Sequence, residues 1–500
     1  MRRFCSATDP GRTHSCVPCS HSCEHVFIRP TERVHTSVNA ARTSAYATCV
    51  LLLLPFAVTG ESADAIYTAR YVVTMDASRR LIENGAVAVR GERIVAVGPR
   101  AEIDKQYQAK QRLDRPGAIL MPGLIDTHTH AAMSLLRGIA DDLTLQEWLE
   151  KYIFPAEAKN VTADFVLWGT RLACLEMMLS GTTTFVDMYY FEDRVAQATK
   201  EAGMRGVLGE TIIGFPVPDA KTPEESLKFT EGFIKKFKGD PLIVATVAPH
   251  AIYTNSDATL RACHRLAARY GVPLVIHLSE TKRENDDAQA KRGMSPTRLL
   301  DILGVLDGPV IAAHGVWLDD KDIAILKRHG TGVAHCPSSN MKLASGVAPV
   351  LKLLAAGVPV GLGPDGPAGS NNDFDLMEEM NLASNLQKVT SGDPRALPAL
   401  QSIEMATILG ARVAGLDKEI GSLEAGKRAD FITLRLDRPH AVPLYNVYSQ
   451  IVYALKGSDV QDVTVNGKPI VRDGRSLTLN AAEIMEKARE YRAKISASLR

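Results

Sequence analysis

The spacing of apolar and polar residues changes along the chain and divides it into distinct regions. After residue 65, short apolar segments alternate with polar positions and are separated by turn residues, which predicts the strands of an antiparallel sheet. The same alternating pattern occurs again near the C-terminus, where Asn466 and Gly467 predict a hairpin turn. These segments are 65–74, 85–89, 93–97, 429–434 and 460–468. Two β-rich ends predict one small β-sandwich domain built from both.

The central region of the chain has a different pattern, in which short apolar strands are followed by longer helical stretches. The eight expected strands are 124–126, 184–187, 206–209, 243–247, 273–276, 309–313, 331–334 and 358–362. Regular alternation of strand and helix favours a parallel sheet, and eight such units favour a closed barrel. The predicted fold is therefore α/β, a (β/α)8 TIM-like barrel with a small β-sandwich domain.

This pattern implies five consecutive regions. They are a leader segment at 1–65, an N-terminal sandwich segment at 66–119, the barrel at 120–420, a C-terminal sandwich segment at 421–476 and a C-terminal helix at 477–500.

Charge and composition restrict the class of partner. The chain has 500 residues, of which 45% are hydrophobic and 23% charged, and its formal net charge is +1. A protein that binds a nucleic acid polymer is expected to carry a basic patch, and no long basic run occurs here. Small molecules are the better expected partners.

An apolar run at 45–58 precedes the predicted domains. It is shorter than the roughly 20 residues of a membrane-spanning helix. Arg42 lies before it, and Ala63 and Ala65 form a small-x-small cleavage site after it, which is typical of a signal peptide. We therefore expect export to the periplasm or beyond, by a signal around 42–65. An N-terminal anchor and a mis-assigned start codon, which would leave the protein cytoplasmic, are the competing interpretations.

Histidines and an aspartate follow several of the predicted barrel strands. His128 and His130 end the first strand, and residues two apart on an extended chain point the same way. His277 and His314 end the fifth and sixth strands, and Asp365 follows the eighth. Because the active site of such a barrel lies at the carboxyl ends of its strands, this set predicts a metal site.

The chain from about 64 to 475 resembles the amidohydrolase superfamily, and in particular the 5-methylthioadenosine/S-adenosylhomocysteine deaminases of the deaminase and chlorohydrolase group. The stretches that carry the resemblance are MPGLIDTHTH at 121–130, HLSET at 277–281, AHG at 313–315, HCPSSNMKLASG at 335–346 and GPDGPAGSNN at 363–372.

The resemblance implies that His128, His130, His277 and Asp365 bind one metal ion. Three imidazoles and a carboxylate suit Zn²⁺, and Fe²⁺ or another divalent ion is compatible with them. Relatives with two metals use a modified lysine after strand four, whereas this chain has His250 there. A single metal ion per subunit is therefore expected, and the resemblance also implies a homo-oligomer.

The resemblance also implies three catalytic residues. His314 would position and deprotonate the metal-bound water, and Glu280 would donate a proton to the ring nitrogen beside the attacked carbon. Asp365 would pass a proton to the departing amine. Glu280 and Asp365 would also touch the substrate, and such general acid/base roles need hydrogen-bond reach. The alternative for Glu280 is a solvated loop carboxylate.

Substrate contacts implied by the resemblance involve Glu157, His250 and Ser370. Glu157 would accept the protons of the ribose hydroxyls, as a carboxylate can. His250 would face the nucleoside, and Ser370 would contact the base or sugar. The alternative for Glu157 is an ordinary residue at the start of a helix, where the dipole favours an acid.

Several functions remain open from the sequence. The leading hypothesis is hydrolytic deamination of 5'-methylthioadenosine, S-adenosylhomocysteine or adenosine. A guanine, cytosine or s-triazine substrate, including hydrolytic dechlorination, fits the same metal site and acid. A catalytically dead binding module is the third hypothesis. One departure is Pro364, which stands where many relatives have threonine, and which removes a backbone N–H from the loop that carries Asp365 and Ser370.

Overall fold

The computed structural model of the chain describes residues 60–499. The apolar run at 45–58 and most of the predicted leader lie outside the described residues. Within 60–499, no helix combines the length and apolar character needed to cross a membrane. Cys174, Cys263 and Cys336 are buried free thiols.

Eight parallel strands close into a barrel, as the strand–helix alternation predicts, and every predicted segment contributes one of them. The strands are β5 (Leu124–Thr129), β6 (Thr182–Tyr189), β7 (Arg205–Ile212), β8 (Ile243–Pro249), β9 (Leu274–Leu278), β10 (Val310–His314), β11 (Gly332–His335) and β12 (Val360–Leu362). Nearly all of their residues are buried, which is typical of parallel strands covered on both faces.

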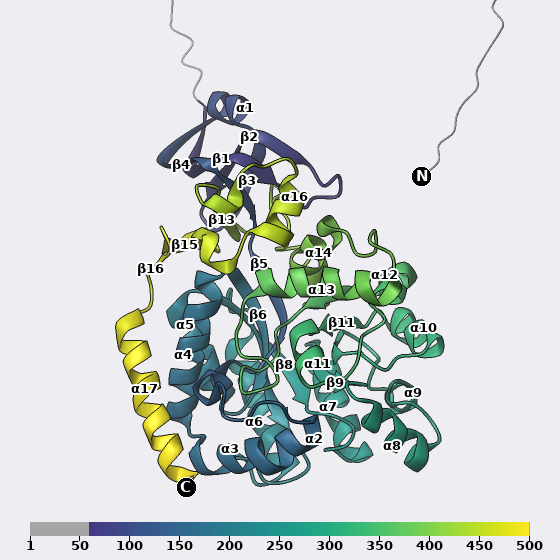
Figure 1. Cartoon of the computed structure of the whole chain (residues 1–500). Helices are drawn as coiled ribbons and strands as arrows, with labels where there is room; N and C mark the ends of the chain where they lie inside the picture. The colour runs from purple at the N-terminus through teal and green to yellow at the C-terminus, as the bar shows by residue number, and fades with distance from the viewer. Residues whose placement is uncertain (1–59, 500) are drawn as a thin grey trace, which may run out of the picture. The chain divides into compact units, whose positions relative to one another are not determined.

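Helices follow the barrel strands and surround them (Figure 1). The principal ones are α4 (Ala163–Leu179), α5 (Glu192–Ala202), α6 (Pro223–Phe237), α7 (Asp257–Tyr270), α8 (Lys282–Arg292), α9 (Pro296–Ile302), α10 (Asp320–His329), α11 (Pro337–Lys342), α12 (Val350–Ala356), α13 (Leu376–Ser391), α14 (Ala399–Ala406) and α15 (Ile408–Val413). Several begin at a serine or threonine, such as Thr162 and Ser256, whose hydroxyl accepts the amide hydrogen of the third helical residue.

One connection is longer than the others and lies between β5 and α4. It contains η1 (Ala131–Leu136), α2 (Leu145–Glu147), η2 (Trp148–Ile153) and α3 (Phe154–Asn160). Because it follows the carboxyl end of β5, it lies on the side of the barrel where the active site is expected.

Both chain ends build a second sheet of eight strands, in the order β16-β15-β14-β13-β4-β1-β2-β3. The strands are β1 (Glu61–Val73), β2 (Leu81–Arg90), β3 (Arg93–Pro99), β4 (Tyr107–Pro122), β13 (Phe431–Arg435), β14 (Val460–Val465), β15 (Lys468–Arg472) and β16 (Arg475–Ser476). In Figure 1 the purple N-terminal strands lie beside the yellow-green C-terminal ones.

The pairing of this sheet differs from the antiparallel arrangement expected from the sequence, because β1 and β4 are parallel. The intervening β2, β3 and α1 (Arg100–Gln106) form a crossover that returns the chain in its original direction. β1 also begins at Glu61, so the expected cleavage site at 63–65 lies within a paired strand.

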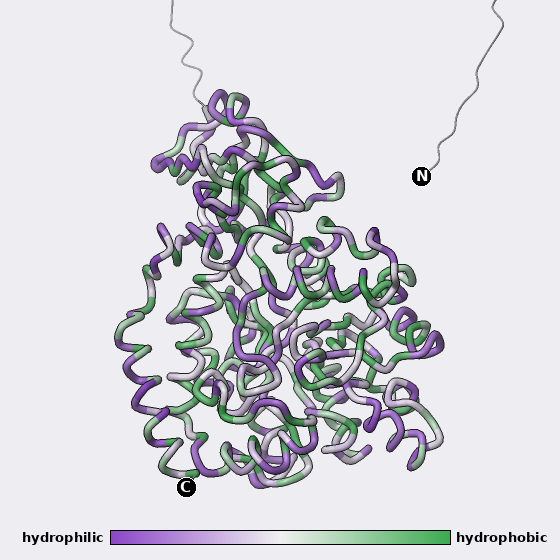
Figure 2. The backbone as a smooth tube through the Cα atoms, viewed as in Figure 1, coloured by the Kyte–Doolittle hydropathy of each residue, from purple (hydrophilic) through white to green (hydrophobic). Residues whose placement is uncertain are grey.

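The hairpin and the C-terminal helix follow the sequence pattern. Asn466 and Gly467 join β14 to β15 and both have positive φ, as a two-residue type I′ turn requires. The last helix, α17 (Ala481–Ser498), buries Ile484, Tyr491 and Ile495. Hydrophilic and hydrophobic stretches alternate along it in Figure 2, as in an amphipathic helix.

A buried ion pair joins the barrel to the second sheet. Arg205, at the start of β7, donates to Asp430 Oδ2 over 2.9 Å, and the two side chains are only 5% and 2% exposed. Asp430 Oδ1 also accepts the amide hydrogen of Asn466 over 2.6 Å. The carboxylate therefore holds the barrel and the hairpin together.

Replacing Arg205 with alanine should destabilise the protein strongly, because Asp430 would remain buried without its cation. We expect a loss of about 3–5 kcal/mol in the free energy of unfolding, measured by urea denaturation. The matched control is Lys200→Ala, which removes a more exposed ion pair with Asp240 and should cost less than about 1 kcal/mol. Equal losses in the two variants would contradict this role of Arg205.

Candidate metal centre and active site

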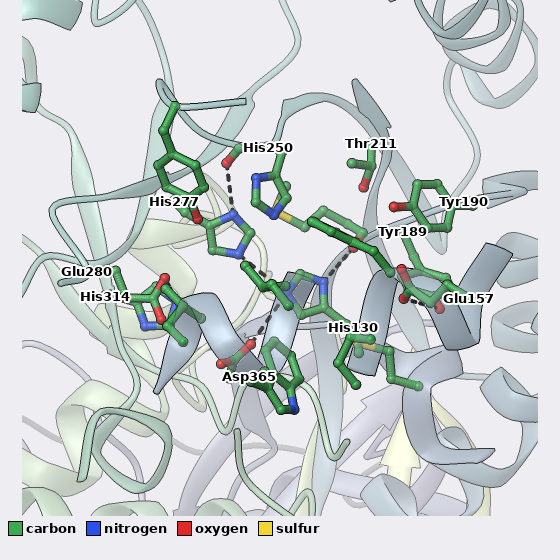
Figure 3. A pocket seen from close by; sticks show the side chains of 18 residues that line it. His130, Glu157, Tyr189, Tyr190, Thr211, His250, His277, Glu280, His314 and Asp365 are labelled. Carbon is green, nitrogen blue, oxygen red and sulfur yellow. Dashed lines mark hydrogen bonds and ion pairs between the residues drawn. The ribbon is translucent and has the colours of Figure 1, made fainter. Parts of the chain in front are cut away.

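Four of the predicted residues meet at the carboxyl ends of the barrel strands, and Figure 3 shows three of them, His130, His277 and Asp365. His128 lies within β5 and His130 follows it, and their Nε2 atoms lie 3.4 and 3.3 Å from Asp365 Oδ1. His277, in β9, places its Nε2 atom 3.3 Å from Nε2 of His130. The structure thus brings the three histidines and the aspartate into one cluster.

Backbone carbonyls orient two of these imidazoles. Nδ1 of His130 lies 2.7 Å from the carbonyl oxygen of Met188, and Nδ1 of His277 lies 2.8 Å from that of His250. Because a carbonyl only accepts, each Nδ1 carries the hydrogen and donates it. The Nε2 lone pairs are therefore left facing the cluster, which is the usual arrangement of metal-binding histidines.

The protonation of the cluster is compatible with a cation. Burial lowers the pKa of His128 to about 4, so this imidazole is neutral near pH 7. Burial also disfavours a charged His130, but the Asp365 carboxylate outweighs it and raises the pKa of His130 to about 9. The cluster therefore attracts positive charge, and a metal ion would replace that proton.

The residues fit a divalent metal ion. One ligand atom each from His128, His130 and Asp365 lies within 4.8 Å of the others, and the same holds for His128, His277 and His314. Both ring nitrogens of His128 are buried without a hydrogen-bond partner among the described residues, which is costly unless another group pairs with them. Imidazole and carboxylate ligands are typical of zinc and neighbouring transition metals.

The two candidate acid/base residues lie together beside this cluster. His314 ends β10, and its Nδ1 atom lies 3.0 Å from Asn340 Oδ1. Its other nitrogen, Nε2, lies 3.8 Å from Glu280 Oε2. Burial raises the pKa of Glu280, which favours the protonated form that a general acid needs.

Backbone conformation at the site is unusual. Ser279, His314 and Asp365 have φ values of 51°, 71° and 68°, in the left-handed region that residues with a β-carbon rarely adopt. Each follows or ends a barrel strand. Strained residues of this kind gather at functional sites, where the surrounding structure holds them in place.

The loop around Asp365 is held by hydrogen bonds despite Pro364. The amide of Asp365 donates to the carbonyl of His128 over 3.1 Å, and Ser339 Oγ donates to Asp365 Oδ2 over 2.7 Å. The carbonyl of Pro364 accepts a hydrogen bond from Asn371.

Ser370 is buried and donates to the carbonyl of Gly366 over 2.5 Å. It lies outside the pocket lining, so its geometry does not support a substrate contact.

A pocket extends from the metal cluster to Glu157 in α3 (Figure 3). Glu157 is 4% exposed, and its Oε1 atom accepts a hydrogen bond of 2.7 Å from the hydroxyl of Tyr189. Burial raises the pKa of this carboxyl to about 7. His250 lines the same pocket between the two ends, and burial lowers its pKa to about 3.

Sequence reasoning missed the residues that support this site. Asn340 and Ser339 hold His314 and Asp365, and Tyr189 holds Glu157. Ser339 and Asn340 lie in a stretch noted for its resemblance, just after β11, and Tyr189 ends β6. Tyr189 lies at the carboxyl end of a barrel strand, which is the signal that would have found it, whereas Ser339 and Asn340 lie in α11.

Comparison with known proteins agrees with this geometry. Residues 119–470 match the Amidohydrolase family. The chain is 46% identical over 440 residues to 5-methylthioadenosine/S-adenosylhomocysteine deaminase 1 of Syntrophus aciditrophicus (strain SB), covering 88% of this chain and 99% of that protein. It is 43% identical to 5'-deoxyadenosine deaminase of Methanosarcina acetivorans, over 85% of this chain and 97% of that protein.

A solved structure extends the comparison to three dimensions. An adenosine deaminase from Xanthomonas campestris with bound zinc superposes with a TM-score of 0.86 at 38% identity, covering 88% of this chain and 100% of that one. Together with the family match over more than half of the chain, these similarities show that the chain belongs to the amidohydrolase family, and that it is a hydrolase of C–N bonds.

Proposed function

We propose that the chain is a zinc-dependent deaminase of adenosine-type nucleosides, which replaces the 6-amino group with oxygen and releases ammonia. The observation that carries the proposal is the buried carboxylate of Glu157, at the far end of the pocket that holds the metal cluster. A carboxylate there suits the two hydroxyls of a ribose. The relatives named above, which are called deaminases of adenosine derivatives, support the same substrate class.

His128, His130, His277 and Asp365 would hold the metal ion, and zinc is the ion that their chemistry favours. When bound, zinc lowers the pKa of a coordinated water to about 7. His314 is fixed by Asn340 through Nδ1, so its free Nε2 atom is the base that accepts a proton from the attacking water.

Glu280 acts at the purine ring in this proposal. Its protonated carboxyl donates to N1 while water adds to C6, and it later recovers a proton from the hydroxyl at C6. Asp365 passes to the amine the water proton that His314 first accepted, and the C6–N6 bond breaks to release ammonia. Protons balance, because one water hydrogen leaves with ammonia and the other restores Glu280.

Metal removal gives a first test. We expect about one zinc per chain by elemental analysis of the purified protein. Chelation should abolish activity and lower the melting temperature, because an ion that binds only the folded state stabilises it. His128→Ala should lose the metal, whereas His264→Ala, on the outer helix α7, should keep it. Full activity after complete removal of metal would refute the assignment.

Substrate choice gives a second test. The panel holds 5'-methylthioadenosine, adenosine, guanine, cytosine and a chloro-s-triazine, with release of ammonia or chloride as the readout. We expect turnover of the adenosine nucleosides, and a fall in kcat of about 10²- to 10⁴-fold in Glu280→Gln with the metal retained. Turnover of a free base or triazine alone would exclude the nucleoside assignment, and inactivity on all substrates would favour a binding module.

Glu157→Gln tests recognition of the ribose. We expect kcat/KM for the ribonucleoside to fall about 10- to 100-fold, the usual effect of losing hydrogen bonds to a charged group. The 2',3'-dideoxy analogue should be nearly unaffected. Tyr189→Phe is the matched control, because it removes the hydrogen bond to Glu157 and leaves the carboxylate in place.

The same pair of substrates tests the pKa of Glu157. Because this pKa is raised to about 7, the ionised acceptor is lost as the pH falls below 7. The ratio of kcat/KM for the ribonucleoside over its dideoxy analogue should therefore decline at acidic pH. In Glu157→Gln the ratio should not change with pH, and a pH-independent ratio in the unmodified enzyme would argue against diol binding by this residue.

A further inference from the structure

The charge of the pocket lining is strongly one-sided. Eighteen of the described residues line the pocket, and none of these eighteen is an arginine or a lysine. Its carboxylates are Glu157, Glu280 and Asp365, and its other titratable groups are histidines and tyrosines. A substrate with a negatively charged group would meet no arginine or lysine side chain here.

The end of the pocket near Glu157 is apolar. The connection after β5 contributes aliphatic and aromatic side chains, namely Leu145, Leu149, Ile153 and Phe154. Phe154 packs edge-on against Phe215, with ring centroids 5.4 Å apart. Tyr190 and Thr211 complete the wall on the strand side, and Figure 3 shows both near Glu157. Such a wall favours an uncharged group that can leave water.

Further carboxyl groups lie behind this wall. Glu210 accepts the amide hydrogen of Glu192 over 3.1 Å, and Asp219 accepts that of Phe191 over 2.5 Å. Burial raises the pKa of the Tyr190 hydroxyl, and the nearby Glu157, Asp219 and Glu210 raise it further. The charged groups that act on the Tyr190 hydroxyl are thus carboxyl groups, and none of them could pair with an anion.

We infer that this enzyme prefers adenosine nucleosides with a neutral 5' substituent, such as hydrogen or methylthio, and discriminates against S-adenosylhomocysteine. The inference rests on the proposed function, in which Glu157 holds the ribose and directs the 5' group along the apolar wall. The homocysteine tail carries an ammonium group and a carboxylate. The ammonium could pair with an acidic side chain, whereas the carboxylate would lose water without gaining an arginine or lysine partner. The methylthio group would instead lie against Leu149, Ile153 or Phe154.

A series of 5'-thio nucleosides tests the inference with the full-length, metal-loaded enzyme. The compounds are 5'-methylthioadenosine, 5'-butylthioadenosine and S-adenosylhomocysteine, and kcat/KM is measured by ammonia release. The butylthio compound has a long tail without charge and so separates length from charge. We expect the two neutral compounds to agree within about tenfold and S-adenosylhomocysteine to be at least about 100-fold poorer.

Each outcome has one meaning. A kcat/KM for S-adenosylhomocysteine within tenfold of that for 5'-methylthioadenosine would overturn the inference and leave the proposed deaminase intact. A butylthio compound as poor as S-adenosylhomocysteine would also overturn it, because length would then be the cause. Failure to deaminate any nucleoside would instead overturn the proposed function, and the inference with it.

Discussion

The structure depends on the closure of the barrel between its first and last strands. β12 pairs with β5 through Leu362 and Asp126, and the amide of Asp365 then donates to the carbonyl of His128. This approach needs glycine at 363, where a β-carbon would lie 2.7 Å from both the nitrogen and the oxygen of the His128 backbone. The contact that closes the barrel therefore also brings the aspartate to the histidines.

Closure and chemistry are linked through electrostatics. Three imidazoles and a carboxylate are buried in one cluster, and each buried polar group needs a partner to offset its loss of water. Backbone carbonyls satisfy the outer nitrogens of His130 and His277, while Ser339 satisfies the outer oxygen of Asp365. The inner atoms are left to one another and to a cation. The backbone at His314 and Asp365 has positive φ, and strain of this kind is expected where the surrounding structure forces side chains into a functional site.

The eight barrel strands and the positions of His128, His277 and Asp365 were predictable, because each depends on local periodicity and on where a strand ends. The parallel pairing of β1 with β4 was not, since it depends on a crossover between distant segments. The hydroxyl of Tyr189 on Glu157 joins β6 to α3, and no local pattern reports such a contact. Ser370 is the opposite case. It lies in a stretch that resembles the family, yet its side chain bonds to the carbonyl of Gly366 and does not line the pocket.

The pocket has two parts with different structural origins, and this explains which of its residues could be predicted. The groups proposed to act on the reacting carbon project from strand ends, whose positions are fixed by the barrel's hydrogen bonds. The wall proposed to face the 5' group comes mostly from the connection after β5, whose path is set by its own packing, as when Trp148 donates to the carbonyl of Ala368. The type of reaction can therefore be predicted from the residues at the strand ends, whereas the selectivity for the 5' group can be inferred only from the folded structure of the connection after β5.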